Sequence, residues 1–317
     1  MNMEQIAFGP VPSRRLGRSL GINNIPPKIC SYSCIYCQLG RTIKMQVDRR
    51  AFHSPREILK GVQEKIERAR EMGESVDYLT FVPDGEPTLD INLGREIELL
   101  RALGIKIAVI TNASLIWQPD VRYDLMGADW VSLKVDSVQE EIWRRIDRPR
   151  GTLRLRSILD GMLEFASVYR GDLTTETMLV RHLNDGDDQV TAVAGLVAQL
   201  KPAKAFLSIP TRPPAEKGVQ PPEEEVINRA YQVFSEKVGC VEYLIGYEGN
   251  AFAFTGDAER DILGTTAVHP MREEAVREFL AKAKTDWSIV EKLVTQGQLI
   301  RTEYEGRYFY MRKLHGT

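Results

Sequence analysis

Cysteine and histidine are scarce in this sequence, with four of each among 317 residues. The few cysteines are mostly clustered, which argues against disulfides and for a reducing compartment, so we expect a cytoplasmic protein. No stretch has the apolar run that a membrane-spanning helix needs, so no membrane is expected as a partner. Met1–Gln5 lacks the features of a signal peptide. The net charge of −2 neither requires nor excludes nucleic acid.

Charge is unevenly distributed along the chain. The first 50 residues carry eight basic side chains and two acidic ones, which suits this stretch to an anionic ligand. Arg14 and Arg15 belong to it, and Arg212 follows a later predicted strand. We take these three arginines as candidate substrate-binding residues. On charge alone, a solvated surface loop is an equally good interpretation.

Helical and strand patterns alternate from about residue 54 to residue 247. Ser54 and Pro55 have the character of an N-cap and a first helical residue, and an amphipathic run follows them. Strands are predicted at 78–83, 105–112, 130–136, 173–180, 204–211 and 241–247. Helices are predicted at 54–72, 93–103, 137–147, 153–170 and 187–200 and from residue 221, with a short helical stretch between 112 and 130. This order predicts an α/β domain over 1–250, with a parallel sheet that is open or curled into a partial barrel.

The C-terminal part has a different pattern. Periodicity lapses over 248–268, and helices are then predicted near 271–284 and 287–295. Two alternating runs follow, joined by Glu305-Gly306, which is a hairpin signal. Two helices and a hairpin predict a small winged-helix-like α+β domain over 265–317. Its charges nearly balance, so a lid or docking module is favoured over a nucleic-acid reader.

Several polar side chains are predicted on the strand face that points into the interior of the barrel. In the strand 130–136, alternation sends Lys134 and Asp136 to the same face as Ser132, opposite an apolar face. Buried unpaired charges are costly, and the carboxyl ends of parallel strands form the site in such folds, so we take Lys134 and Asp136 as candidate catalytic residues. Glu176 and Asn112 lie on or at the end of neighbouring strands. The alternative is a frayed strand end where these groups reach water.

Three of the four cysteines, Cys30, Cys34 and Cys37, form a Cys-x3-Cys-x2-Cys loop. Structural zinc needs four ligands, usually in two separated pairs, but Cys240 stands alone and the histidines show no ligand spacing. Three thiolates without a fourth better fit a [4Fe–4S] cluster with one iron open to a second ligand. Cys240 is expected to act as a small buried hydrophobe.

The loop, with Tyr36 before its last cysteine, resembles that of the radical S-adenosylmethionine superfamily. The strand-end sequence Asp84-Gly85-Glu86-Pro87 resembles the glycine–glutamate motif of the same superfamily. The resemblance implies a partial (β/α)6 barrel, a [4Fe–4S] cluster and S-adenosylmethionine as cofactors, and a one-electron reductant of the flavodoxin or ferredoxin type. In that family the reduced cluster cleaves the sulfonium, and the 5′-deoxyadenosyl radical abstracts a substrate hydrogen atom.

The resemblance also implies roles for individual residues. Cys30, Cys34 and Cys37 would ligate iron. The cofactor-binding residues would be Tyr36 at adenine, Gly85 and Glu86 at the methionine amino group, Asn112 and Ser132 at methionine or ribose, and Glu176 at ribose or substrate.

Longer stretches, at 9–17, 85–89, 210–214 and 269–274, resemble an iron–sulfur oxidoreductase group related to wyosine synthases. Those enzymes condense pyruvate with a methylated guanosine of transfer RNA, using a second cluster whose three additional cysteines this chain lacks. Lys134 could be a Schiff-base lysine or could neutralise Asp136. The leading hypothesis is a radical enzyme acting on transfer RNA. The alternatives are a peptide, protein or small-metabolite substrate, and an iron–sulfur redox-sensing regulator that binds nucleic acid.

Overall fold

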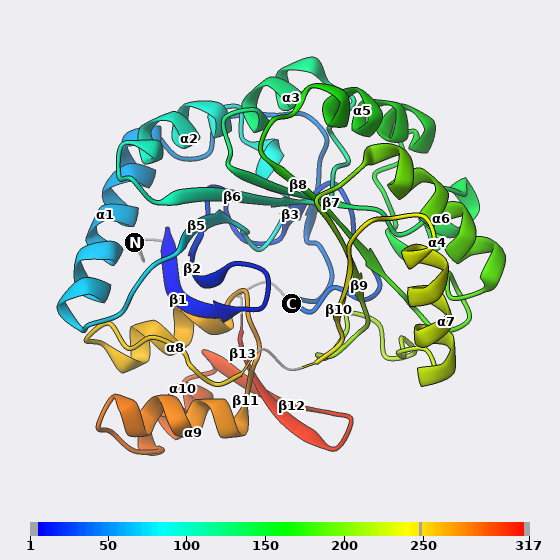
Figure 1. Cartoon of the computed structure of the whole chain (residues 1–317). Helices are drawn as coiled ribbons and strands as arrows, with labels where there is room; N and C mark the ends of the chain where they lie inside the picture. Colours follow the sequence, from blue (N-terminus) through cyan, green and yellow to red (C-terminus); the bar gives the residue numbers. More distant parts are fainter. Residues whose placement is uncertain (1–5, 247–248, 314–317) are drawn as a thin grey trace.

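The computed structural model of the protein describes residues 6–246 and 249–313. Its main sheet has the strand order β1-β2-β5-β6-β7-β8-β9-β10, with β1 and β2 antiparallel and the others parallel. The strands are β1 (Ala7–Ser13), β2 (Gly17–Ile22), β5 (Tyr78–Phe81), β6 (Lys106–Thr111), β7 (Trp130–Lys134), β8 (Asp172–Met178), β9 (Lys204–Ser208) and β10 (Val241–Leu244). Figure 1 shows the sheet curled into a half-barrel, which confirms the predicted partial α/β barrel.

Helices cover the outer side of the curled sheet (Figure 1). They are α1 (Pro55–Glu71), α2 (Leu93–Arg101), α3 (Pro119–Leu125), α4 (Glu140–Ile146), α5 (Leu155–Val168), α6 (Asp187–Leu200) and α7 (Glu224–Ser235), with the short 3₁₀ turn η1 (Pro87–Leu89) after β5. The start of α1 follows the predicted signal: the Ser54 hydroxyl accepts from the Glu57 amide, and the Glu57 carboxylate accepts from the Ser54 amide. None of the helices in the described ranges combines the length and apolar character that crossing a membrane would demand.

The predicted strands are longer than the observed ones at their carboxyl ends. The strand predicted at 130–136 ends at Lys134, so Asp136 lies in the loop that follows β7. Ser132 lies within β7, in register with Ile110 and Thr174. At the strand ends, Asp136 contacts Tyr36 of the cysteine loop, and Asn112 contacts Ser31 of the same loop. The site is therefore built at this carboxyl edge.

The C-terminal part contains α8 (Ala258–Thr266), β11 (Met271–Arg272), α9 (Glu273–Lys282), α10 (Ser288–Thr295), β12 (Leu299–Tyr304) and β13 (Arg307–Arg312). The predicted hairpin is present, with positive φ at Glu305 and Gly306, as its two-residue turn requires. The helix predicted from 271 begins only at Glu273. Helix α8 was not predicted, because its buried face includes Asp261, Thr265 and Thr266, which gives no apolar periodicity.

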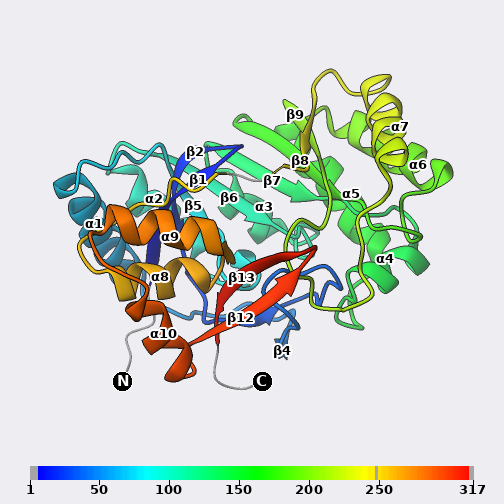
Figure 2. The same cartoon turned by 90° about the horizontal axis from the view of Figure 1, so that it is seen from below.

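The C-terminal part shares a hydrophobic core with the first strand. Phe8 and Val11 of β1 belong to the same buried cluster as Phe252, Phe279 and Leu293. Figure 1 shows α8 beside β1, with α9 on the outer side of α8, and Figure 2 gives the view from below. The first and last parts of the chain are thus packed together on one side of the barrel.

A buried ion pair also joins α1 to the C-terminal part. Lys65 Nζ on α1 lies 2.6 Å from Asp261 Oδ1 and donates to Thr255 Oγ1 at 2.8 Å. Both charged side chains are less than a tenth exposed. Lys65, Thr255 and Asp261 therefore supply one another's hydrogen-bond partners where α1 packs against the C-terminal part, shielded from water.

Lys65→Met is expected to lower the free energy of unfolding by about 3–5 kcal/mol, because Asp261 would stay buried without a counter-ion. Chemical denaturation measures the change. The control is Lys60→Met on the same helix, where the side chain is 78% exposed and its pair with Glu64 spans 3.9 Å; its effect should stay within about 0.5 kcal/mol. Equal effects of the two substitutions would contradict the role given to Lys65.

Candidate active site at the cysteine loop

The cysteine loop lies over the carboxyl ends of the parallel strands. It starts from β3 (Ile29–Cys30), which pairs with β4 (Lys44–Met45). The end of α4 holds its middle: the Ser33 amide donates to the Asp147 carbonyl at 3.0 Å and the Ile35 amide to the Ile146 carbonyl at 2.9 Å. The loop is thus fixed by backbone hydrogen bonds that do not involve the cysteine sulfurs.

The three loop cysteines are half-buried, and burial raises the pKa of each thiol. Thiols in such a place ionise poorly unless a metal supplies compensating positive charge. Within residues 6–246 and 249–313, no group of three or more His, Cys, Asp or Glu side chains is arranged to hold a single metal ion. The donor set fits a cluster held by three thiolates. Cys240 precedes β10 at the opposite, amino end of the sheet.

The Asp84–Glu86 segment is joined to the start of the cysteine loop by backbone hydrogen bonds. The Lys28 amide donates to the Asp84 carbonyl at 2.7 Å, and the Glu86 amide donates to the Ile29 carbonyl at 3.2 Å. Gly85 forms a parallel bridge with Ile29, and a Cβ at Gly85 would lie 2.0 Å from the Ile29 carbonyl oxygen. Only glycine permits this approach.

The Glu86 carboxylate points into the protein and is 1% exposed. Its Oε1 accepts from the Thr88 amide and hydroxyl and from the Thr111 hydroxyl, and its Oε2 accepts from the Asn112 amide at 2.8 Å. Burial raises the Glu86 pKa, although these hydrogen bonds act in the opposite direction. The side chain therefore holds the end of β6 in place. Its contact with a methionine amino group stays a prediction.

Asn112 is brought directly to the cysteine loop. Its Nδ2 lies 3.0 Å from Ser31 Oγ and 3.4 Å from Cys30 Sγ, while its Oδ1 accepts from the Ser114 amide at 2.9 Å. An amide that donates toward a thiolate can orient that ligand and stabilise its negative charge. Asn112 therefore contacts the first loop cysteine, and its contact with the cofactor stays a prediction.

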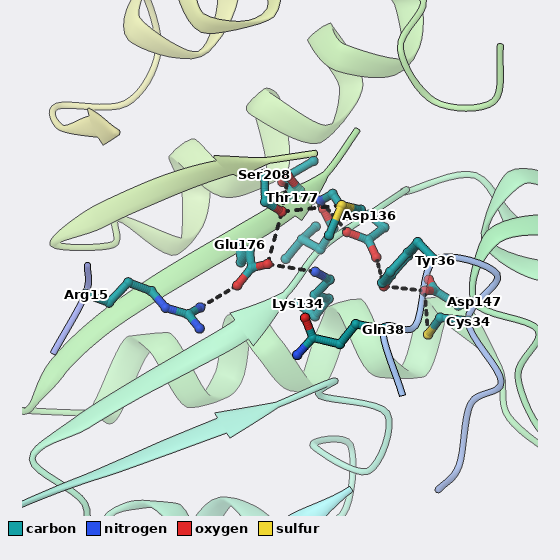
Figure 3. Close-up of polar contacts among 12 residues, drawn as sticks. Arg15, Cys34, Tyr36, Gln38, Lys134, Asp136, Asp147, Glu176, Thr177 and Ser208 are labelled. Carbon is teal, nitrogen blue, oxygen red and sulfur yellow. Dashed lines mark hydrogen bonds and ion pairs between the residues drawn. The ribbon is translucent and has the colours of Figure 1, made fainter. Parts of the chain in front are cut away.

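Inside the half-barrel, Lys134 and Glu176 form an ion pair (Figure 3). Lys134 Nζ lies 2.9 Å from Glu176 Oε1, which also accepts from Ser208 Oγ at 3.0 Å, and Arg15 binds Glu176 Oε2. Burial raises the Glu176 pKa, but Lys134 and Arg15 outweigh it and the net pKa is lowered. Burial lowers the Lys134 pKa, but Glu176 and then Asp136 outweigh it and the net pKa is raised. Lys134 is therefore an ammonium ion, and its direct partner is Glu176 rather than Asp136.

Tyr36 connects the loop to two buried carboxylates (Figure 3). Its hydroxyl contacts Asp136 Oδ2 and lies 3.1 Å from Asp147 Oδ1, while Asp136 Oδ1 accepts from the Met178 amide at 2.7 Å. Lys134 Nζ lies 4.9 Å from the centre of the Tyr36 ring. The predicted residues Tyr36, Lys134 and Asp136 thus form one network.

Asp147 was missed by sequence reasoning. It is buried at the end of α4, and its Oδ1 lies 3.3 Å from Cys34 Sγ. Burial raises its pKa, and the nearby Asp136 raises it further. An acidic residue after a helical pattern normally indicates a solvated helix end, so the sequence carries no signal for this contact.

The three arginines predicted to bind substrate lie at different places in the structure. Arg15 enters the Glu176 network, whereas Arg14 Nη1 lies near Gly246 at the end of β10. Arg212 Nη1 donates to Gln38 Oε1 at 2.6 Å, and its Nη2 lies 3.0 Å from His269 Nε2. Arg212 therefore links the cysteine loop to the C-terminal part, a location that its position in the sequence did not indicate.

Comparisons with known proteins identify the family and the fold. The family model of the radical SAM superfamily matches residues 24–192. The UPF0026 protein MJ1312 of Methanocaldococcus jannaschii is 50% identical over 311 residues, covering 98% of this chain and 96% of that protein. A radical SAM methyltransferase from Sphaerobacter thermophilus has a similar fold, with a TM-score of 0.55 and 16% identity over 72% of this chain and 66% of that chain. TYW1 with a lysine-pyruvate adduct bound gives a TM-score of 0.50 at 14% identity, over 71% of this chain and 76% of that chain.

The family defines the cofactors, a [4Fe–4S] cluster and S-adenosylmethionine, and requires an external electron donor. The half-barrel matches the fold of radical SAM enzymes, whereas roles for the cysteine loop and the glycine–glutamate segment stay predictions. The match of the family model and the identity to MJ1312 over nearly the whole chain lead to the same conclusion: the chain belongs to the radical S-adenosylmethionine superfamily.

Proposed function

We propose that this enzyme uses its radical chemistry to modify RNA, with transfer RNA as the substrate. The proposal is supported chiefly by the position of the cysteine loop, which lies within the most cationic stretch of the chain. Lys44 and Arg50 in this stretch are exposed and suited to phosphate contacts. The longer motifs shared with the wyosine-synthase group support the same substrate class. A cytoplasmic location and a flavodoxin- or ferredoxin-type reductant are parts of the proposal.

In the proposed site, Cys30, Cys34 and Cys37 hold the cluster, which when bound and reduced supplies the electron that cleaves S-adenosylmethionine. Asn112 and the Gly85–Glu86 backbone lie next to the loop and are proposed to contact the methionine part of the cofactor. For Tyr36, Ser132 and Glu176, contacts with adenine, ribose or substrate remain proposals.

The network of Lys134, Asp136, Glu176 and Arg15 below the cysteine loop is proposed to face the substrate. Lys134 and Asp136 would bind and orient it, with Arg15 fixing Glu176 and thereby the lysine. The ion pair with Glu176 keeps Lys134 as a fixed positive charge rather than a free amine. Such a group suits binding an anionic or carbonyl-bearing part of the substrate.

The proposal is tested in two steps. Reconstituted anaerobic protein with a chemical reductant should form 5′-deoxyadenosine from S-adenosylmethionine. Mass spectrometry of nucleosides from bulk transfer RNA should then show a modification that is lost in cells without the gene and restored by the wild-type gene. Identical nucleosides in both strains would reject transfer RNA and turn the search to peptides or metabolites.

Lys134 is expected to resist pyruvate adduct formation under borohydride reduction, because its amine is held protonated by Glu176. Peptide mass spectrometry measures the adduct. Glu176→Gln removes that charge and should increase trapping, whereas Glu242→Gln, which removes a surface partner of Lys204, should not. Efficient trapping at Lys134 in the wild-type protein would show that its pKa is not raised and would favour a Schiff-base reaction.

A further inference from the structure

Lys28 lies two positions before the first loop cysteine, with its side chain directed inward. Its φ of +63° is rare for a residue with a side chain. The backbone conformation is held at both ends: the Lys28 amide donates to the Asp84 carbonyl at 2.7 Å, and its carbonyl accepts from the Lys44 amide at 3.0 Å. The side chain is 7% exposed. The fold therefore maintains an unusual backbone conformation that buries a lysine under the cysteine loop.

The buried ammonium group has an incomplete set of partners. Lys28 Nζ lies 3.5 Å from Asp84 Oδ1, a weak ion pair between two buried side chains. Within the described part of the chain, neither Lys28 Nζ nor Asp84 Oδ2 makes a hydrogen bond. An ammonium with three donors is costly to bury in this state unless another acceptor is present.

The amine lies on the side of the loop where Cys37 lies. A Cβ built at Gly40 would be 3.8 Å from Lys28 Nζ, and the Gly40 amide donates to the Cys37 carbonyl at 3.0 Å. Burial raises the Cys37 pKa, and the positive charge of Lys28 is the strongest effect opposing it. We therefore expect the hydrogen-bond acceptors that Lys28 Nζ lacks to be supplied on the Cys37 side of the loop, where the cluster would bind.

We infer that Lys28 is a positioning residue for the cluster: its ammonium group donates to a sulfur on the Cys37 side and raises the reduction potential of the cluster. Reduction adds one negative charge, which a nearby cation in a low-dielectric environment stabilises. Hydrogen bonds to sulfur and net charge are among the factors that set such potentials. The inference rests on the cluster held by the three cysteines, and it does not depend on the substrate.

Asp84 should have the opposite effect. Its carboxylate is the counter-ion of Lys28 and faces the same loop, and its negative charge opposes the effect of Lys28 on Cys37. The pair therefore adjusts the potential in both directions. The remaining lysine near Cys37, Lys134, is already bound to Glu176 and has less freedom to serve the cluster.

The test is an EPR-monitored redox titration of the reconstituted full-length protein without S-adenosylmethionine. Lys28→Met should make the cluster about tenfold harder to reduce at a given potential, equivalent to about 59 mV for one electron. Lys28→Arg should stay near the wild-type potential, because it keeps the charge and the donors. Lys44→Met, which removes an exposed charge from the same loop region, should leave the potential unchanged.

Asp84→Asn provides the second variant and should shift the potential in the positive direction. Equal potentials for wild type and Lys28→Met, at equal iron and sulfide content, would overturn the inference while leaving the cluster assignment intact. If Lys28→Met holds no cluster, Asp84→Asn decides, and an unchanged or more negative potential overturns the inference. A wild-type protein that assembles no cluster would overturn the cluster assignment and this inference together.

Discussion

Alanine in place of Cys30, Cys34 or Cys37 is expected to reduce 5′-deoxyadenosine formation to the level of a protein-free control. Each thiolate is proposed to hold a different iron, and the family chemistry starts at such a cluster. Cys240→Ala is the matched control and should retain wild-type activity, because Cys240 lies at the opposite end of the sheet. Liquid chromatography of the quenched reaction measures the product, and iron and sulfide analysis measures the cluster.

The loop substitutions should leave the fold largely unchanged. The loop cysteines are only half-buried, and the loop is held by backbone hydrogen bonds that do not involve sulfur, from Ser33 and Ile35 to the end of α4 and from Gln46 to the Cys30 carbonyl. Thermal unfolding of the cluster-free proteins should therefore agree within a few degrees. Wild-type 5′-deoxyadenosine formation by any one of the three variants would exclude that cysteine as a ligand.

Gly85→Ala is expected to have the second-largest effect, with loss of both cluster retention and activity. A methyl group at this position would lie 2.0 Å from the Ile29 carbonyl oxygen. The parallel bridge between Gly85 and Ile29 must therefore break. Overpacking of this kind typically costs about 1–3 kcal/mol of folding stability. The chemical effect should be larger, because Ile29 leads directly into the first cysteine.

Gly195→Ala is the control for this substitution. Gly195 lies within α6, with open space around its Cα, and alanine there should be neutral or stabilising by up to about 1 kcal/mol. Denaturation of both variants and iron content after reconstitution measure the two effects. A Gly85→Ala protein with normal iron content would show that the segment moves freely from the loop, contrary to the structure.

Much of the candidate site could be predicted because its signals are local. The spacing of Cys30, Cys34 and Cys37 is complete within eight residues, and alternation within one strand was enough to send Lys134 inward. The partner of Lys134 could not be predicted in the same way. Strand register, which places Lys134 opposite Glu176, is a relation between two strands, and no single strand carries it.

The remaining differences also come from contacts between distant parts of the chain. Asp147 reaches Cys34 only because α4 folds back over the cysteine loop, and Arg212 meets His269 only through the packing of the C-terminal part. Helix α8 has a polar buried face whose Asp261 is satisfied by Lys65. Such a helix lacks the apolar period on which sequence prediction depends.

The shared core of β1 and the C-terminal part has a consequence for synthesis on the ribosome. The β1–β2 hairpin can pair early, because its strands are neighbours in the chain. Phe8 and Val11, however, meet Phe252 and Leu293 only after nearly the whole polypeptide has been translated. Contacts of such sequence separation form slowly and leave apolar surface exposed meanwhile. We therefore expect nascent chains that end before residue 250 to need chaperone protection at their N-terminal strand, although their barrel helices are already complete.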